Sequence, residues 1–274
     1  SIFPLDLSIS AINLSGRKVY SGIVRDVTAR KKAEEEISKA LEQLEESNME
    51  LERFAYAASH DLQEPLLMVV SFTGLLKEEY SNQLNEEACG YLNFASDAAS
   101  RMQALISDLL EYSKIGQEAE RFIEVDCQQA IGNALDNLAE SVKQTKAVVT
   151  YDKLPVITAN PIRMIRLFQN LIGNAIKYTP HDLDPIVHVS CESKDNLWVF
   201  SVTDNGIGMK KDYLKKIFEP FKRLHSSNEY VGTGIGLAIC KKIIENFGGD
   251  IWVESESQKG SIFYFTIPKL QKNK

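Results

Sequence analysis

The stretch Asn170-Leu-Ile-Gly-Asn174-Ala-Ile-Lys177-Tyr178 lies in an apolar-periodic run that predicts a helix over residues 160–178. Asn170 and Asn174 are one helical turn apart and share a face with Lys177. Packing gives no reason for such a polar stripe. Amide oxygens can join a hydrated Mg²⁺ ion, and a lysine one turn further on can meet phosphates. The stretch therefore predicts a helix that binds a nucleotide.

Two glycine-rich stretches follow this helix in the chain. They are Asp204-Asn-Gly206-Ile-Gly208 and Gly232-Thr233-Gly234-Ile-Gly236-Leu237. Glycine adopts positive φ and lets backbone N–H groups approach phosphate oxygens closely. A lone Gly-x-Gly is more often an ordinary turn, and a polar helix face is usually only solvated. Three such stretches in order within residues 170–237 favour a nucleotide site.

These stretches resemble the ATP-binding domain shared by sensor histidine kinases, gyrase-type topoisomerases, mismatch-repair ATPases and a class of heat-shock chaperones. The resemblance implies that Asn174 is the Mg²⁺ ligand and Lys177 a phosphate contact. It also implies that Tyr178 forms a wall of the adenine pocket and that Asp204 accepts the adenine amino group. The other residues it assigns to the ATP pocket are Asn170, Gly206, Gly208, Gly232, Thr233, Gly234, Gly236 and Leu237.

Position 170 separates the members of this group. The hydrolysing members carry a glutamate there, which activates water, whereas this chain has Asn170. An amide cannot take a proton from water at neutral pH, so the site is expected to hold ATP and to transfer its γ-phosphoryl group to another acceptor.

The segment 217–223 resembles the F box that histidine kinases place before a mobile lid, and the polar segment 224–231 suits that lid.

A histidine lies on the outside of a predicted coiled coil. Apolar or small residues recur in a four-three alternation, with Asn48 at one core position: Leu41, Leu44, Leu51, Ala55, Ala58 and Leu62. In this register His60 faces water. Most surface histidines have no role, but Ser59-His60-Asp61-Leu62-Gln63-Glu64-Pro65-Leu66 resembles the H box of histidine kinases. The resemblance implies that His60 is phosphorylated and that Asp61 orients or deprotonates it.

Glu64 and Pro65, which follow His60 closely in the chain, carry further expectations. Pro65 breaks a backbone hydrogen bond and is expected to bend the helix. Many histidine kinases have Thr or Asn where this chain has Glu64, and use it to position a water that dephosphorylates the partner. The resemblance therefore does not extend to phosphatase activity.

A second helical pattern over residues 88–109 predicts a helical hairpin with its loop near 78–86. The apolar stripe is too wide for one neighbour, so two hairpins from two chains are expected to form a four-helix bundle, which makes the protein a homodimer. Beyond it, strands are predicted at 147–151, 186–192, 197–204, 250–255 and 261–267, and helices at 126–144, 160–178, 210–216 and 234–247. The fold class is α+β, with helices on one face of the sheet in a two-layer sandwich.

Residues 1–28 alternate between apolar and polar and predict two or three antiparallel strands with a turn at Asn13–Gly16. Their end, 22–28, and the charged run after it resemble the last strand of a PAS sensor domain and its signalling helix. The expected domains are the end of a truncated PAS domain (1–28), a coiled-coil signalling helix (29–53), a dimerisation and phosphotransfer domain (54–118) and an ATP-binding domain (119–270). The native protein is expected to be longer at its N-terminus.

Composition limits the classes of function. The chain has 274 residues, of which 44% are hydrophobic, so general disorder is excluded. A net charge of −7 without a basic run argues against nucleic acid as a partner. No apolar run is long enough to span a membrane, although segments outside this sequence could anchor the protein. Four cysteines without metal-ligand spacing favour a reducing compartment, the cytoplasm.

These patterns predict an ATP-dependent histidine kinase that autophosphorylates His60 and passes the phosphoryl group to an aspartate on a response regulator receiver domain. A catalytically silent, nucleotide-binding dimeric scaffold is the alternative, which the intact His60 and ATP boxes disfavour. An ATP-hydrolysing clamp is a third hypothesis, which Asn170 disfavours. The stimulus, and whether His60 takes its phosphoryl group from its own chain or its partner, stay open.

Overall fold

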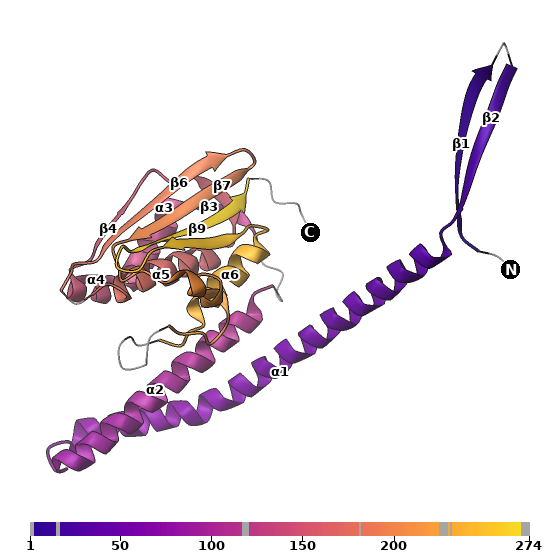
Figure 1. The fold of residues 1–274 in the computed structure, drawn as a ribbon. Helices are drawn as coiled ribbons and strands as arrows, with labels where there is room; N and C mark the ends of the chain where they lie inside the picture. Colours follow the sequence, from indigo (N-terminus) through magenta and orange to yellow (C-terminus); the bar gives the residue numbers. More distant parts are fainter. Residues whose placement is uncertain are drawn as a thin grey trace. The chain divides into compact units, whose positions relative to one another are not determined.

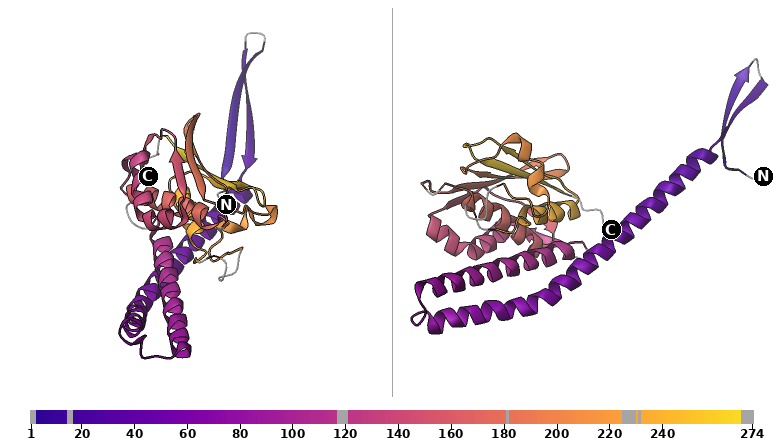
Figure 2. Two further views of the ribbon diagram at one scale, coloured as in Figure 1. Left: turned by 90° about the vertical axis from the view of Figure 1, so that its left-hand side faces the viewer. Right: turned by 60° about the horizontal axis from the view of Figure 1, so that its bottom comes forward.

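The computed structural model describes residues 3–14, 17–116, 121–180, 182–224, 230 and 232–269 (Figures 1 and 2). The chain divides into two compact units, Ser1–Phe54 and Ala55–Lys274. A single long helix, α1 (Thr28–Tyr80), has its first half in one unit and its second half in the other. No helix in the described ranges is long and apolar enough to cross a membrane.

The first unit begins with an antiparallel ribbon. Strands β1 (Leu5–Leu14) and β2 (Arg17–Asp26) pair over their full length, which confirms the predicted antiparallel strands. The predicted turn includes positions 15 and 16, which lie outside the described residues. Asp26 caps the helix that follows, since its Oδ1 accepts the N–H of Thr28 at 2.9 Å. Leu7 and Val24 are both exposed, so this ribbon has no core of its own.

The second half of α1 and helix α2 (Glu86–Lys114) form the predicted hairpin (Figure 2). At the loop end, Cys89 Sγ lies 3.6 Å from the carbonyl oxygen of Ser81, and at the other end Lys114 Nζ lies 5.4 Å from the ring centre of Tyr56. The helix assignment continues through Pro65. Buried side chains between the two helices are Ser59, Leu66 and Ala99.

The hairpin also exposes many large apolar side chains, which its own two helices do not cover. Leu62 of the predicted coiled-coil seam is among them, while its neighbour Ser59 is buried within the chain. The full set in the described part of the hairpin is Tyr56, Leu62, Leu67, Met68, Val69, Phe72, Leu75, Leu76, Tyr80, Leu84, Tyr91, Phe94 and Met102. Soluble proteins rarely leave so much contiguous apolar surface in water, so this surface is suited to a partner.

A five-stranded mixed sheet forms one layer of the C-terminal domain. Its order is β4-β6-β7-β9-β8, with β4 and β6 parallel and the other pairs antiparallel. The strands are β4 (Val148–Tyr151), β6 (Ile186–Lys194), β7 (Leu197–Asp204), β8 (Ile251–Ser255) and β9 (Ser261–Pro268). All five were predicted, with ends that differ by at most two residues.

Helices α3 (Cys127–Asn137), α5 (Pro161–Lys177) and α6 (Gly236–Asn246) cover one face of this sheet (Figure 1). Phe168 of α5 lies edge-on to Phe200 and Phe265 of the sheet, at 6.2 and 6.1 Å between ring centres. On the other face Trp252 remains partly exposed. The predicted two-layer sandwich is confirmed, with the core between the helices and the sheet.

Two predicted helices are wrong in detail. The single helix expected over 126–144 is α3 followed by α4 (Ala139–Thr145), because at Leu138 the backbone tightens and its N–H lies 3.0 Å from the carbonyl oxygen of Leu135. The helix expected over 210–216 is two short 3₁₀ turns, Lys211–Tyr213 and Lys216–Phe218, after which Pro220 prevents helical continuation.

The sequence reasoning missed a second, two-stranded sheet, β3 (Ile123–Asp126) with β5 (Val156–Ala159).

The C-terminal part of α2 packs on the domain: Leu105, Leu109 and Tyr112 contact its core, and Lys242 of α6 lies 4.4 Å from the ring centre of Tyr112.

Candidate functional site

Local chemistry fixes the start of helix α5, the helix that carries the polar stripe. Asn160 caps its start, where its Oδ1 accepts the N–H groups of Ile162 and Arg163 at 3.0 and 3.2 Å, and Pro161 occupies the first helical position. One face of the helix is buried in the core, including Leu171 and Ile172. The asparagines of the stripe face a pocket instead.

The pocket has an apolar part beneath the segment between the two glycine stretches. It is lined by Asn174, Tyr178, Asp204, Ile207, Gly208, Met209, Ile217, Lys222, Arg223, Leu224, Leu237, Ser261 and Phe263. A flat apolar slot with few polar groups is suited to an aromatic base. Five predicted residues, Asn174, Tyr178, Asp204, Gly208 and Leu237, meet here, whereas Ile207, Met209, Ser261 and Phe263 were not predicted.

Asp204 is the acidic group of this slot, at the end of β7. Its Oδ1 accepts the N–H groups of Gly206 at 2.8 Å and Ser261 at 3.0 Å. Burial raises the pKa of Asp204 above its ordinary value, against the two backbone hydrogen bonds, which lower it. Because both of these bonds end on Oδ1, Oδ2 is available to a ligand N–H group.

Gly206 is required by close packing at the same place. A Cβ on this residue would lie 2.7 Å from the carbonyl oxygen of Tyr178 and 2.9 Å from Asp204 Oδ1. The neighbouring Ile207 donates its N–H to the same Tyr178 carbonyl at 2.9 Å. Only glycine lets the chain after β7 approach the end of α5 so closely.

The polar part of the pocket adjoins the slot along α5 and the second glycine stretch. Its lining is Asp108, Asn170, Asn174, Lys177, Tyr178, Ile217, Lys222, Gly232, Thr233, Gly234, Gly236 and Leu237. The structure thus brings together every residue that the sequence assigned to the phosphate end. Asp108, from α2, was not predicted.

Lys177 and Tyr178 form one edge of this part. Lys177 Nζ lies 3.0 Å from the Tyr178 hydroxyl and 4.4 Å from the centre of its ring. The Tyr178 ring lies 5.0 Å from that of Tyr230, and Arg223 donates to the carbonyl oxygen of Tyr230 at 2.6 Å. Positions 225–229 and 231 of the predicted lid lie outside the described residues.

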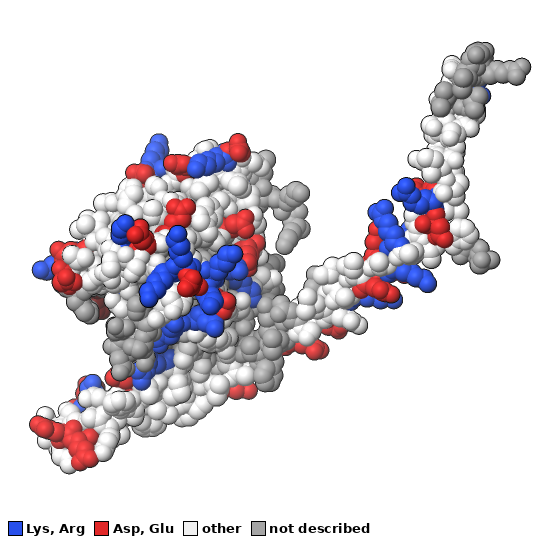
Figure 3. Space-filling model, in the orientation of Figure 1, with Lys and Arg blue, Asp and Glu red and all other residues white. Residues whose placement is uncertain are grey.

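Basic side chains are frequent in the segment between the two glycine stretches, which contributes Lys222 and Arg223 to the pocket. Figure 3 shows Lys and Arg gathered over the segment between the two glycine stretches. The residues are Lys210, Lys211, Lys215, Lys216, Lys222 and Arg223. This positive field favours an anionic ligand, in spite of the net negative charge of the chain. Figure 3 also shows acidic side chains at the loop end of the hairpin.

Asn170 and the start of α6 complete the polar part. The Nδ2 atom of Asn170 is buried and has no hydrogen-bond partner among the described residues. A Cβ on Gly236 would lie 3.2 Å from Asn170 Oδ1, so the first turn of α6 lies directly against this amide. No side chain caps α6, and its first N–H groups are therefore available to phosphate oxygens.

His60 and Asp61 lie on α1, and the imidazole side chain is 63% exposed, which confirms the predicted outward position. His60 Nδ1 lies 3.4 Å from Asp61 Oδ1. This contact favours the tautomer that carries its proton on Nδ1 and leaves the lone pair on Nε2 free. The arrangement is suited to a nucleophilic imidazole.

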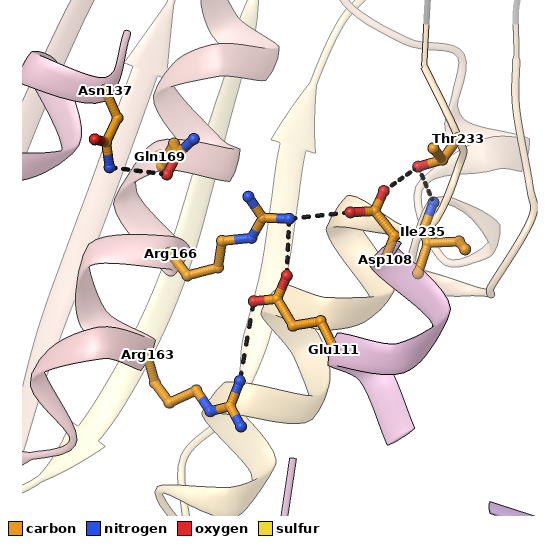
Figure 4. A network of polar contacts seen from close by, with 8 residues as sticks. All are labelled: Asp108, Glu111, Asn137, Arg163, Arg166, Gln169, Thr233 and Ile235. Carbon is orange, nitrogen blue, oxygen red and sulfur yellow. Dashed lines mark hydrogen bonds and ion pairs between the residues drawn. The ribbon is translucent and has the colours of Figure 1, made fainter. Parts of the chain in front are cut away.

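The sequence reasoning missed a polar network between α2 and α5 (Figure 4). Arg166 Nη2 lies 3.0 Å from Asp108 Oδ1 and 2.8 Å from Glu111 Oε2. Arg163, on the same helix, lies 3.9 Å from Glu111. The one signal in the sequence is the matched spacing: the two carboxylates, Asp108 and Glu111, are three residues apart, and so are the two arginines.

Two family models match the chain. The histidine kinase-, DNA gyrase B-, and HSP90-like ATPase model matches residues 159–271, and the His Kinase A phospho-acceptor domain model matches residues 50–118. Together they cover more than half of the chain. The first contains all of the described pocket lining except Asp108, and the second contains His60 and α2.

The curated proteins with similar sequences are longer than this chain. Cyanobacterial phytochrome A of Nostoc sp. is 46% identical over 234 residues, which cover 85% of this chain and 30% of the phytochrome. The sensor protein kinase WalK of Staphylococcus aureus is 32% identical over 231 residues, which cover 82% of this chain and 55% of that kinase. The chain thus spans less than two thirds of either relative.

Two solved structures share the fold. Full-length ShkA in complex with AMPPNP gives a TM-score of 0.63 at 24% identity, over 81% of this chain and 47% of that one. Histidine kinase ThkA in complex with response regulator protein TrrA gives a TM-score of 0.55 at 24% identity, over 99% and 76%. At this level of sequence identity, the similarity shows a shared fold and nothing more.

Proposed function

The chain belongs to the sensor histidine kinases, and from that premise we propose that it phosphorylates His60 with ATP and passes the phosphoryl group to an aspartate of a response regulator. The observation that carries the proposal is the presence, in one chain, of an exposed His60–Asp61 pair and a pocket lined by residues that the sequence assigned to ATP. The chain spans only part of its relatives, so the activity of the whole protein belongs to this proposal.

ATP binds with its base in the apolar slot and its phosphates in the polar part. Asp204 Oδ2 accepts the amino group of adenine, and Tyr178 and Leu237 border the base. The phosphates lie against Lys177 and the first turn of α6, where lysine and free N–H groups supply positive charge. The complex of ShkA with AMPPNP supports this assignment by analogy of fold.

Asn174 and Asn170 both line the phosphate end, where an amide oxygen is a ligand that Mg²⁺ accepts, whereas the buried Nδ2 of Asn170 is a donor suited to a phosphate oxygen. Asn174 is the ligand that we propose. A bound Mg²⁺ ion would neutralise charge on the phosphate oxygens. Asn170 cannot act as a general base toward water, and so the pocket preserves ATP for the histidine.

In the transfer step, Nε2 of His60 attacks the γ-phosphorus of ATP. The N–P bond forms as the bond from phosphorus to the bridging oxygen breaks, and ADP leaves with that oxygen. Asp61 takes the proton from Nδ1, since its Oδ1 lies 3.4 Å away. The phosphohistidine then gives its phosphoryl group to a carboxylate of the receiver domain. The complex of ThkA with TrrA supports a regulator as partner.

The exposed apolar side chains of the hairpin support a homodimer. They lie on two helices that cover only one face of each other, and a second hairpin would bury them in a four-helix bundle. We therefore propose that dimerisation occurs through residues 54–118 and that α1 continues as a coiled coil upstream, over 29–53.

Residues 1–28 are proposed as the last strands of a PAS domain, with the catalytic domain over 119–270. The open ribbon of β1 and β2 is consistent with a domain that continues outside this sequence. The free thiols of Cys89, Cys127, Cys191 and Cys240 are consistent with the cytoplasm as the site of action.

Incubation with γ-labelled ATP and Mg²⁺ tests the proposal. Acid-labile, alkali-stable label on the wild-type chain, absent from His60→Gln, is the expected result. The matched control is His188→Gln, because His188 lies on the sheet, where it contacts Thr150 and Asp152. ATP binding without label would instead favour the silent scaffold, and steady ATP turnover without label would favour the hydrolysing clamp.

A further inference from the structure

The second glycine stretch is tied to helix α2 by a hydrogen bond. The hydroxyl of Thr233 donates to Asp108 Oδ2 at 2.6 Å, across 125 positions of the chain (Figure 4). Thr233 Oγ1 also accepts the N–H of Ile235 at 3.3 Å, and so the hydroxyl links α2 to the residue just before α6. The carboxylate of Asp108 therefore lies at the phosphate end of the pocket.

The other oxygen of Asp108 is held by Arg166. Arg166 Nη2 lies 3.0 Å from Asp108 Oδ1 and 2.8 Å from Glu111, one helical turn away. These side chains are largely buried, with exposed fractions of 18% for Asp108, 22% for Glu111 and 28% for Arg166. Ion pairs shielded in this way are screened less by salt than surface pairs.

The position of Asp108 conflicts with a bound triphosphate. Asp108 lines the polar part of the pocket with Asn174, Lys177 and Gly236. Phosphate oxygens placed at the free N–H groups of α6 would lie beside this carboxylate and would compete with it for the Thr233 hydroxyl. Two negative groups at one place repel each other strongly where water is partly excluded.

The hairpin places this contact at the same level along its length as His60. The contacts of Cys89 with Ser81 and of Lys114 with Tyr56 fix one antiparallel register between α1 and α2. In that register His60 pairs with the helical turn of α2 that carries Asp108 and Glu111. The tie between α2 and the glycine stretch thus lies at the level where the phosphoryl group must be transferred.

We propose that Asp108 is a latch which the phosphates of ATP open. Without nucleotide, its carboxylate holds Thr233 and keeps the ATP-binding domain attached to α2. ATP displaces the carboxylate from Thr233, and the domain is released to carry the γ-phosphate toward His60. The inference rests on the proposed nucleotide site and adds a residue of the hairpin that opposes ATP binding.

Titration calorimetry on the full 274-residue chain tests the latch, with Mg²⁺-ATP and with adenosine as ligands. Asp108→Asn keeps the size of the side chain and removes its charge. We expect it to bind ATP roughly three- to tenfold more tightly than wild type, and adenosine within about twofold, because only ATP places negative charge near residue 108. Glu111→Gln is the matched control, since it removes a charge from the same network without a contact to Thr233.

The outcomes separate the latch from the nucleotide site. Equal or weaker ATP binding by Asp108→Asn overturns the latch and leaves the site intact. An equal gain from Glu111→Gln, or an equal gain for adenosine, also overturns it, because the effect would then be general loosening. If wild type binds neither ligand, the proposed nucleotide site itself fails. If Asp108→Asn does not fold, Asp108→Ser provides the same comparison. Unfolding curves of each variant show whether it is folded.

Discussion

Asp204 Oδ1 accepts the N–H of Ser261 at 3.0 Å, which joins the end of β7 to the start of β9 at the base of the adenine slot. The same oxygen accepts the N–H of Gly206, and this fixes the carboxylate plane. The carboxylate that we propose as the acceptor for the base is therefore held by the sheet itself.

Asp204→Asn should weaken ATP binding roughly 10- to 100-fold, because a hydrogen bond to a charged group contributes about 1.5–3 kcal/mol. The amide oxygen can still accept the two backbone N–H groups, so its nitrogen would face the adenine amino group as a second donor. Calorimetry with ATP measures the loss. Asp212→Asn, an exposed carboxylate nearby, should bind like wild type, and equal affinity of the two variants would contradict the assignment of Asp204.

The raised pKa of Asp204 makes adenosine binding sensitive to acid. Burial favours the neutral carboxyl, whereas the ligand requires the ionised one, so affinity should fall as the pH drops through this pKa, at a higher pH than the ordinary value of 3.8 would give. For stability the sign is opposite, since ionisation of a buried group destabilises the fold as pH rises through its raised pKa. Adenosine avoids phosphate titration. If adenosine affinity depended on pH in Asp204→Asn as it does in wild type, ionisation of Asp204 would not be the cause of the acid sensitivity.

Gly206→Ala should destabilise the catalytic domain by roughly 1–3 kcal/mol, because its Cβ would lie 2.7 Å from the Tyr178 carbonyl oxygen and the backbone must shift. Urea unfolding measures this free energy. Gly132→Ala is the control, since a Cβ there meets nothing within 4 Å, and α3 should tolerate it or gain stability. Similar losses for the two variants would mean that the close approach at Gly206 has no energetic role.

Phe94→Glu should convert the proposed dimer to monomers at micromolar concentration, because Phe94 is 76% exposed on α2 within the apolar hairpin surface. Light scattering after size-exclusion chromatography gives the mass. Ile162→Glu changes an equally exposed side chain, 72%, on α5 outside the hairpin, and should leave the dimer intact. A wild-type chain that is monomeric at all concentrations would exclude the four-helix bundle.

The sequence predicted those elements whose pattern is local. Strand β7 ends as expected at Asp204, because an apolar alternation stops there at a glycine-rich turn. α5 differs from its predicted bounds by one residue at each end, since Asn160 and Pro161 mark its start. The glycine stretches identified the pocket because close backbone approach requires that residue type.

What the sequence could not show depends on contacts between distant segments. Strands β3 and β5 pair with each other across about thirty positions of the chain, and this long-range pairing, which the sequence does not show, decides their existence. The ion pair of Asp108 with Arg166 joins residues 58 positions apart, and charged residues on a helix face are ordinarily solvated. Only the packing of α2 on the domain reveals that Asp108 reaches the phosphate end.

The central claim is that His60 receives the γ-phosphoryl group of ATP. The most direct measurement is tandem mass spectrometry of the chain after incubation with Mg²⁺-ATP, with digestion kept at alkaline pH so that phosphohistidine survives. We expect one phosphoryl group on the peptide that contains His60, with fragment ions that place it on the imidazole. A phosphoryl group found only on other residues, or an unmodified His60 peptide in a chain that binds ATP, would contradict the account.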